Sequence, residues 1–131
     1  MKKRLKLLLV GSLGLLSFSC YYDEEIDLSQ ELPDVPDTQI ISFSADIAPL
    51  FTQNGKDCTV CHNGTIANPD LSSANVYSQL VPAYVVAGDA EASELYQKLP
   101  GVNHPIDAGF ILSLDEIALI KTWIDRGAEN N

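Results

Sequence analysis

The pentapeptide Cys58-Thr59-Val60-Cys61-His62 decides how the rest of this 131-residue chain is interpreted. Two cysteines stand three positions apart, and a histidine directly follows the second one. On a helical turn this spacing lets each thiol bond to one vinyl group of a haem, and it places the imidazole beneath the ring, where a nitrogen can bind the iron. The motif therefore predicts a c-type attachment site for one covalent haem c, held by Cys58 and Cys61, with His62 as an iron ligand.

Three other chemistries use a pair of cysteines with this spacing. A thioredoxin-like redox motif expects a βαβ unit, whereas here residues 62–64 have the composition of a turn. A structural zinc ion needs four ligands, and outside the motif the sequence offers only Cys20 and His104. A plain disulfide between Cys58 and Cys61 is the third alternative.

The first 20 residues have the pattern of an export signal. Four cationic side chains fall within the first six residues, and a mainly apolar run over residues 7–18 is too short to span a bilayer comfortably. The run leads to Ser19-Cys20, which resembles the end of a bacterial lipoprotein signal, although the bulky Phe18 stands beside the cleavage point. We expect residues 1–19 to be removed and Cys20 to be lipidated. An ordinary signal peptide and an uncleaved anchor are the alternatives, and each of them also exports the chain.

Removal of the signal leaves 112 residues, which we divide into a lipidated cysteine with an acidic flexible tether, residues 20–40, and one domain, residues 41–131. All 18 acidic residues but only four of the eight basic residues remain, so the formal charge becomes −14, against −10 for the full chain. Such a surface repels nucleic acid and favours exported redox partners with a basic docking face. We expect the protein at the periplasmic face of the cell envelope or on the cell surface, with membrane contact through the lipid anchor.

The apolar patterns of the domain predict helices and no strand of any length, and hence an all-α fold. Ser44, Asp89 and Ser113 are the expected N-caps, and Pro49 weakens the start of the first helix. Ser113 and Glu116 form a capping box, and the apolar stripe of the last helix should pack on the first helix. The expected helices are residues 45–54, 74–80, 90–99 and 114–126.

Three further motifs accompany the haem motif in a fixed order. They are Phe-x-x-x-Ile-x-Pro-Leu-Phe at 43–51, Val-x-Gly-Asp-x-x-x-Ser-x-Leu-Tyr at 86–96, and Leu-Ser-x-x-Glu-Ile-x-x-Ile-x-x-Trp-Ile-x-x-Gly-Ala at 112–128. With these motifs, most of residues 43–128 resembles a small exported class I-like cytochrome c domain on a bacterial lipoprotein. The resemblance implies a small helical domain around a covalently attached haem, thioether bonds at Cys58 and Cys61, His62 as the proximal iron ligand, and electron transfer as the role.

The sequence departs from that family at the second iron ligand. The family supplies a methionine from a loop before the last helix, but the single methionine here is Met1, which is removed with the signal. Asn103-His104-Pro105 stands at the corresponding place, and His62 and His104 are the only histidines. Position and elimination therefore both indicate His104 as the second ligand. The alternative is an exposed loop histidine, with the iron five-coordinate or bound by water, Lys98 or a tyrosine.

These observations predict a monohaem c-type cytochrome with two histidine ligands. Two imidazoles would lower the redox potential relative to a methionine–histidine pair, and they would leave no open iron site. The expected role is therefore that of a lipid-anchored single-electron carrier and not of an enzyme. Two alternatives stay open: a haem-based small-ligand sensor or peroxidase-like protein with an open distal site, and a haem-free lipoprotein interaction module.

Overall fold

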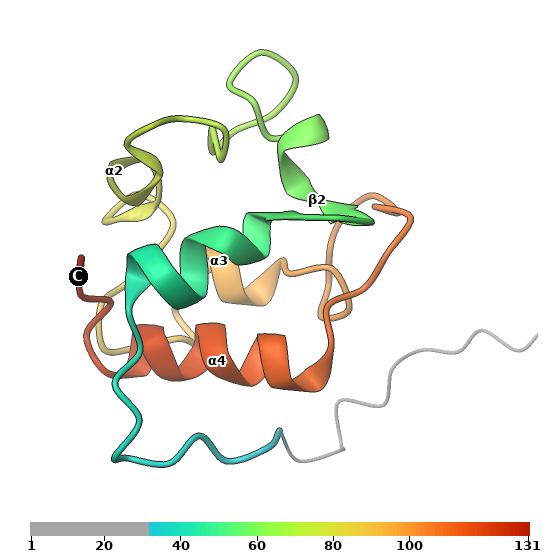
Figure 1. The fold of residues 1–131 in the computed structure, drawn as a ribbon. Coiled ribbons are helices and arrows are strands. Elements are labelled where there is room, and N and C mark those ends of the chain that lie inside the picture. The colour runs from blue at the N-terminus through green and yellow to red at the C-terminus, as the bar shows by residue number, and fades with distance from the viewer. Residues whose placement is uncertain (1–31) are drawn as a thin grey trace, which may run out of the picture.

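The computed structural model describes residues 32–131 (Figure 1). The predicted signal peptide, residues 1–19, the predicted lipidation site Cys20 and the tether as far as residue 31 lie outside the described residues. Within residues 32–131, no helix is both long enough and apolar enough to cross a membrane.

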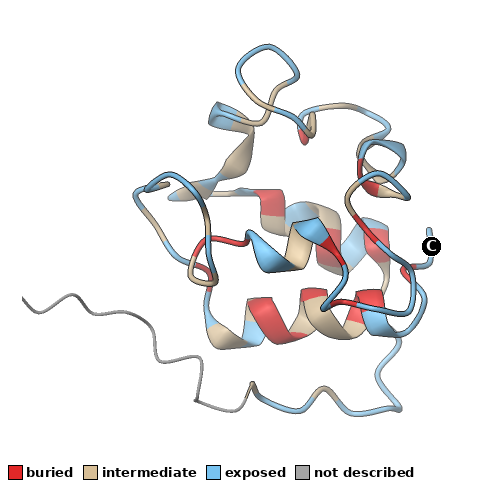
Figure 2. Cartoon of the chain, turned by 180° about the vertical axis from the view of Figure 1, so that it is seen from behind, coloured by how far each residue is buried: buried red, intermediate tan, exposed pale blue. Residues whose placement is uncertain are grey.

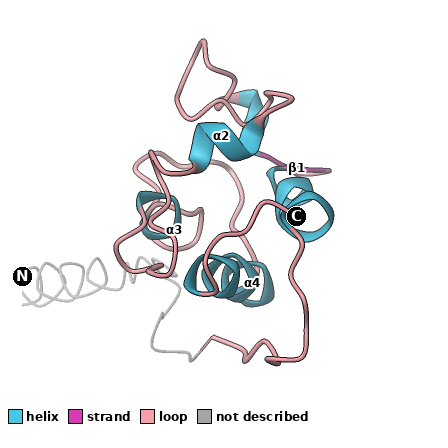
Figure 3. Ribbon diagram, turned by 90° about the vertical axis from the view of Figure 1, so that its left-hand side faces the viewer, coloured by secondary structure: helices cyan, strands magenta, loops and turns pink. Residues whose placement is uncertain are grey.

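Five short elements follow one another closely over residues 43–60, and long loops precede each of the three α-helices (Figure 3). In chain order they are the π-helix η2 (Phe43–Ile47), the 3-10 helix η3 (Ala48–Phe51), strands β1 (Thr52–Gln53) and β2 (Lys56–Asp57), the 3-10 helix η4 (Cys58–Val60), and helices α2 (Val76–Leu80), α3 (Glu94–Gln97) and α4 (Leu114–Asp125). The two strands pair antiparallel, with Thr52 opposite Asp57 and Gln53 opposite Lys56.

The prediction of an all-α, cytochrome c-like helical domain is wrong in its fold class. Only 33% of the described residues are helical, and β1 and β2 form a small sheet. In place of a helix over residues 45–54, η2 is followed by η3, and the chain enters the hairpin at Thr52. Pro49 lacks the N–H that a continuous helix requires at its position. Gly55 adopts a φ of +82°, a conformation that side chains disfavour, and so allows the tight turn between the strands.

Helix α4 confirms the prediction for the end of the domain. The Ser113 hydroxyl accepts a hydrogen bond from the Glu116 N–H at 3.3 Å, and the Glu116 carboxylate accepts one from the Ser113 N–H at 2.7 Å. These two bonds satisfy backbone donors that a helix N-terminus otherwise leaves unpaired. The helix ends at Asp125, and Gly127, with a φ of +107°, follows the C-cap residue Arg126.

The core lies between α4 and η2, as the sequence predicts (Figure 2). The ring of Phe43 lies 5.2 Å from that of Trp123 and 5.1 Å from that of Tyr77, measured between centroids. The polar atoms of these aromatics are also satisfied, because the Trp123 indole donates to the Glu129 carbonyl and the Tyr77 hydroxyl to the Ala128 carbonyl. The fully buried stripe of α4 comprises Ile117, Ile120 and Ile124.

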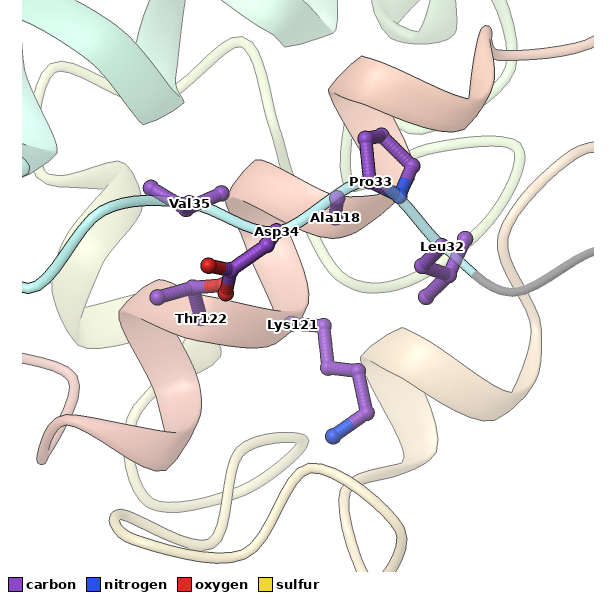
Figure 4. Close-up of a pocket in the computed structure, with 7 residues that line it drawn as sticks. All are labelled: Leu32, Pro33, Asp34, Val35, Ala118, Lys121 and Thr122. Atoms are coloured by element: carbon purple, nitrogen blue, oxygen red, sulfur yellow. The ribbon is translucent and has the colours of Figure 1, made fainter.

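Residues 32–40, here called the strap, run along α4 before the domain begins (Figure 1). Leu32 and Val35 pack against the core. The guanidinium of Arg126 donates hydrogen bonds to the carbonyls of Gln39 at 2.8 Å and Val35 at 2.9 Å, and it pairs with Asp37 at 3.2 Å. Figure 4 shows the shallow groove between the strap and α4, which is lined by Leu32, Pro33, Asp34, Val35, Ala118, Lys121 and Thr122.

The buried core predicts that the same substitution, isoleucine to alanine, destabilises the protein to different extents at a buried and at an exposed position. Ile120 is fully buried, whereas Ile40 is 84% exposed. Ile120→Ala should lower the free energy of unfolding by about 2–5 kcal/mol, because it removes buried methyl groups and leaves a cavity. Ile40→Ala should change it by less than about 0.5 kcal/mol. Denaturant unfolding of both variants is the measurement, and equal losses would contradict the assignment.

Candidate haem site

The cysteine motif begins where the hairpin ends. Asp57, the last residue of β2, caps η4 by accepting hydrogen bonds from the Thr59 N–H at 2.9 Å and the Thr59 hydroxyl at 2.6 Å. The N–H groups of Cys61 and His62 both bond to the Cys58 carbonyl, at 3.3 and 2.9 Å. The two cysteines therefore stand one tight turn apart with His62 directly after them, and neither cysteine is in a disulfide.

A turn fixes the chain immediately after His62. The Asn63 side-chain oxygen accepts hydrogen bonds from the N–H groups of Thr65 and Ile66. Gly64 has a φ of +72°, and a Cβ there would stand 3.1 Å from an Asp70 carboxylate oxygen, so the turn accommodates glycine best. The loop returns so that the Leu71 N–H bonds to the His62 carbonyl at 2.9 Å. The backbone of His62 is thus held from both sides.

His104 lies on a loop whose two ends meet. The Leu112 N–H bonds to the Pro100 carbonyl at 3.0 Å, and Leu112 is buried. Within the loop, His104 Nδ1 lies 2.6 Å from the Ile106 carbonyl oxygen. Because a carbonyl can only accept, Nδ1 is the nitrogen that carries the proton in a neutral ring, and Nε2 keeps its lone pair for a metal.

The structure brings the two predicted ligands together. The rings of His62 and His104, 42 positions apart in the sequence, have centroids separated by 6.1 Å and planes inclined at 76°. Two imidazole nitrogens bound to one metal on opposite sides stand about 4 Å apart, and each ring centre lies roughly an ångström farther out. The observed centroid separation of 6.1 Å agrees with that distance. Without a metal, the same arrangement is an edge-to-face contact.

One nitrogen of His62 also lacks the partner that burial requires. Among the described residues, His62 Nδ1 is the buried side-chain polar atom without a hydrogen-bond partner. An unsatisfied buried polar atom costs about 1–3 kcal/mol. Because a ligating histidine ordinarily hydrogen-bonds through its other ring nitrogen, as His104 does through Nδ1, this atom by itself does not indicate metal binding.

Apolar side chains are exposed on both segments that carry the histidines. Six large hydrophobic residues are exposed in the described part of the chain, and four of them are Val60, Ile66, Ile106 and Ile111. Val60 and Ile66 flank His62 in sequence, whereas Ile106 and Ile111 follow His104. Exposed apolar surface near a candidate site favours a large apolar ligand that would cover it.

The arrangement fits the alternative chemistries less well. Across residues 32–131 no three histidine, cysteine or acidic side chains are grouped as a structural zinc site would need. The strands in this range are antiparallel, so the βαβ unit of a thioredoxin-like motif is not found there. Lys98, an alternative iron ligand, pairs with Glu94 at 2.6 Å.

Two groups near the site have strongly shifted pKa values. Burial, reinforced by the negative charge of Asp57, raises the pKa of the Cys58 thiol to about 11. For Glu116, burial opposes ionisation, but hydrogen bonds from Lys56, Ser113 and Gln53 outweigh it and lower the pKa to about 2. The sequence indicated Glu116 only as part of a capping box, because no local pattern reveals partners some sixty positions away.

The raised pKa of Cys58 predicts that its thiol reacts more slowly than an ordinary thiol in the haem-free, reduced chain. Relative to a thiol with the ordinary pKa of 9.0, Cys58 should react with iodoacetamide at pH 8 roughly ten to a hundred times more slowly, because only the thiolate attacks. Asp57→Asn should raise its rate several-fold by removing the neighbouring charge. Asp37→Asn, remote in sequence, is the control, and peptide mass spectrometry gives both rates. Equal rates in the two variants would contradict the electrostatic effect of Asp57.

No family model matches the chain, and neither a curated protein nor a solved structure is significantly similar to it.

Proposed function

We propose that this chain is a monohaem c-type cytochrome that carries single electrons outside the cytoplasm from a lipid anchor at Cys20. The observation that carries the proposal is the pairing of His62 with His104 at a centroid distance of 6.1 Å. The exposed apolar side chains beside both histidines and the free pair of cysteines one turn apart support it. The cytochrome-like motifs in the sequence indicate that a covalent haem would connect the two cysteines with the two histidines.

Each member of the site has a defined task in this proposal. Cys58 and Cys61 would hold the haem covalently, and His62 and His104 would bind its iron. The bound haem supplies reversible one-electron chemistry at its iron. The hydrogen bond from His104 Nδ1 to the Ile106 carbonyl keeps Nε2 free of a proton and orients the ring.

The ligand pair favours electron transfer over catalysis. If both imidazoles bind the iron, oxygen, peroxide or another small molecule would have no iron site to occupy. Two imidazoles also set a lower potential than a methionine–histidine pair. The strongly acidic chain would steer a basic redox partner toward the protein by long-range attraction.

Covalent haem is the first measurable consequence of the proposal. The exported protein should show a Soret band, and its mass should exceed that of the polypeptide and lipid by one haem. Cys58→Ala with Cys61→Ala should remove the covalent increment, because no thiol remains to form a thioether. A colourless exported protein, with a mass explained by amino acids and acyl chains alone, would overturn the proposal.

Ligation by His104 is tested separately from haem attachment. His104→Ala should convert the reduced and oxidised spectra from low-spin to high-spin, because one strong-field ligand is lost, and it should allow rapid binding of CO. Asp107→Ala, in the same loop, should leave the spectra unchanged. If His104→Ala kept the low-spin bands, His104 would be excluded as the ligand, although the haem would remain.

A further inference from the structure

The carboxylate of Glu116 connects three segments of the chain. Its Oε1 accepts a hydrogen bond from Gln53 Nε2 at 2.8 Å. Its Oε2 accepts one from Lys56 Nζ at 2.8 Å and another from the Ser113 N–H at 2.7 Å. The capping box itself requires only the bond to Ser113. The bonds to Gln53 and Lys56 therefore need an explanation beyond helix capping.

One side of this network leads to the cysteine motif. Gln53 lies on β1 and Lys56 on β2, and the two residues are paired across the hairpin. A single carboxylate thus binds both strands. The hairpin is followed at once by Asp57, the cap of η4, and then by Cys58. Because no residue separates β2 from η4, a shift of the hairpin should also move the cysteine motif and His62.

The other side of the network leads to the loop of His104. Ser113 directly follows Leu112, whose N–H closes the base of that loop on the Pro100 carbonyl. Ser113 is fixed to Glu116 in both directions, through its N–H and its hydroxyl. Glu116 therefore stands where the base of the His104 loop meets the hairpin that precedes the cysteine motif.

The hydrogen bonds that Glu116 accepts should hold the hairpin strongly to the start of α4. The Glu116 side chain is only 17% exposed, and that of Lys56 is 29% exposed, so water screens their interaction less than it screens a fully exposed pair. Hydrogen bonds to an ionised carboxylate are stronger than neutral ones. The lowered pKa of Glu116 agrees with an anion that these donors hold in place.

We propose that Glu116 is a positioning residue, which holds the hairpin before His62 against the base of the His104 loop and so keeps the two imidazoles at the separation that a shared iron needs. This inference rests on the proposed haem function. Loosening the connection should let His104 leave the iron more often, while the haem stays attached through Cys58 and Cys61.

Glu116→Gln and Lys56→Met test the inference in the complete haem protein. The first variant keeps the shape of the side chain but removes its charge, and the second removes one donor and leaves the capping box. Lys121→Met is the matched control, because Lys121 is 31% exposed and its ion pairs are with Asp125 on the same helix and with Glu91, neither of which lies in the hairpin. All three variants should retain covalent haem and its mass.

Binding of cyanide to the ferric protein is the main readout, because cyanide must wait for His104 to leave the iron. We expect Glu116→Gln and Lys56→Met to accelerate this binding at least tenfold, and Lys121→Met to leave the rate near that of the wild type. Amide hydrogen exchange across residues 52–57 gives a readout that does not involve the iron. It should become faster in the first two variants and stay unchanged in the control.

The possible failures can be told apart. If the wild type carried no haem, the proposed function would fall. If the wild type were low-spin and depended on His104, yet cyanide bound at wild-type rates to both Glu116→Gln and Lys56→Met, the positioning role would be overturned and the function would stand. If Lys121→Met accelerated cyanide binding as much as Lys56→Met, general destabilisation would replace the positioning role as the explanation.

Discussion

Burial of α4 against η2 is the interaction on which the rest of this structure depends. Helix α4 is the longest element in the described part of the chain, and its fully buried isoleucines meet Phe43 and the other residues of a single core cluster. The neighbouring elements are too short to be stable alone, since isolated helices of fewer than about 12 residues are marginal in water. They gain their order by contact with this core. The candidate site is therefore built on loops that α4 and η2 support.

The site itself is assembled by short-range hydrogen bonds at the edge of that core. Asp57 caps η4, Asn63 organises the turn after His62, and the base of the His104 loop closes through Leu112. Each arrangement is local, so each histidine is held by its own segment. Only contacts between the segments can fix the separation of the two rings, and Glu116 provides such contacts. For a domain with a small core, covalent attachment of the proposed haem would add a further constraint on the same segments.

Local signals made part of this structure predictable. The capping box and the apolar stripe of α4 were correct because both depend on residues within a few positions of one another. The hairpin was missed, since strands of two residues have no alternation to detect. The first helix was predicted over residues 45–54 with a start weakened by Pro49, whereas the structure has η2 and η3 there and enters the hairpin at Thr52. The meeting of His62 with His104 was anticipated from composition and motif order. The bonds from Glu116 to Gln53 and Lys56 had no signal in the sequence, because they join distant residues.

The contacts of Arg126 with the strap bear on how far the domain could work from a membrane. If lipid is attached at Cys20, as proposed, only the eleven residues 21–31 remain to bridge the distance to Leu32, where the strap already lies on α4. Eleven residues reach at most about 40 Å, whereas a linker released as far as Ile41 would reach about 70 Å. By fastening the strap, Arg126 would in that case nearly halve the reach of the linker between the lipid and the domain. The domain would then exchange electrons close to the lipid surface and would serve partners in the same layer of the cell envelope.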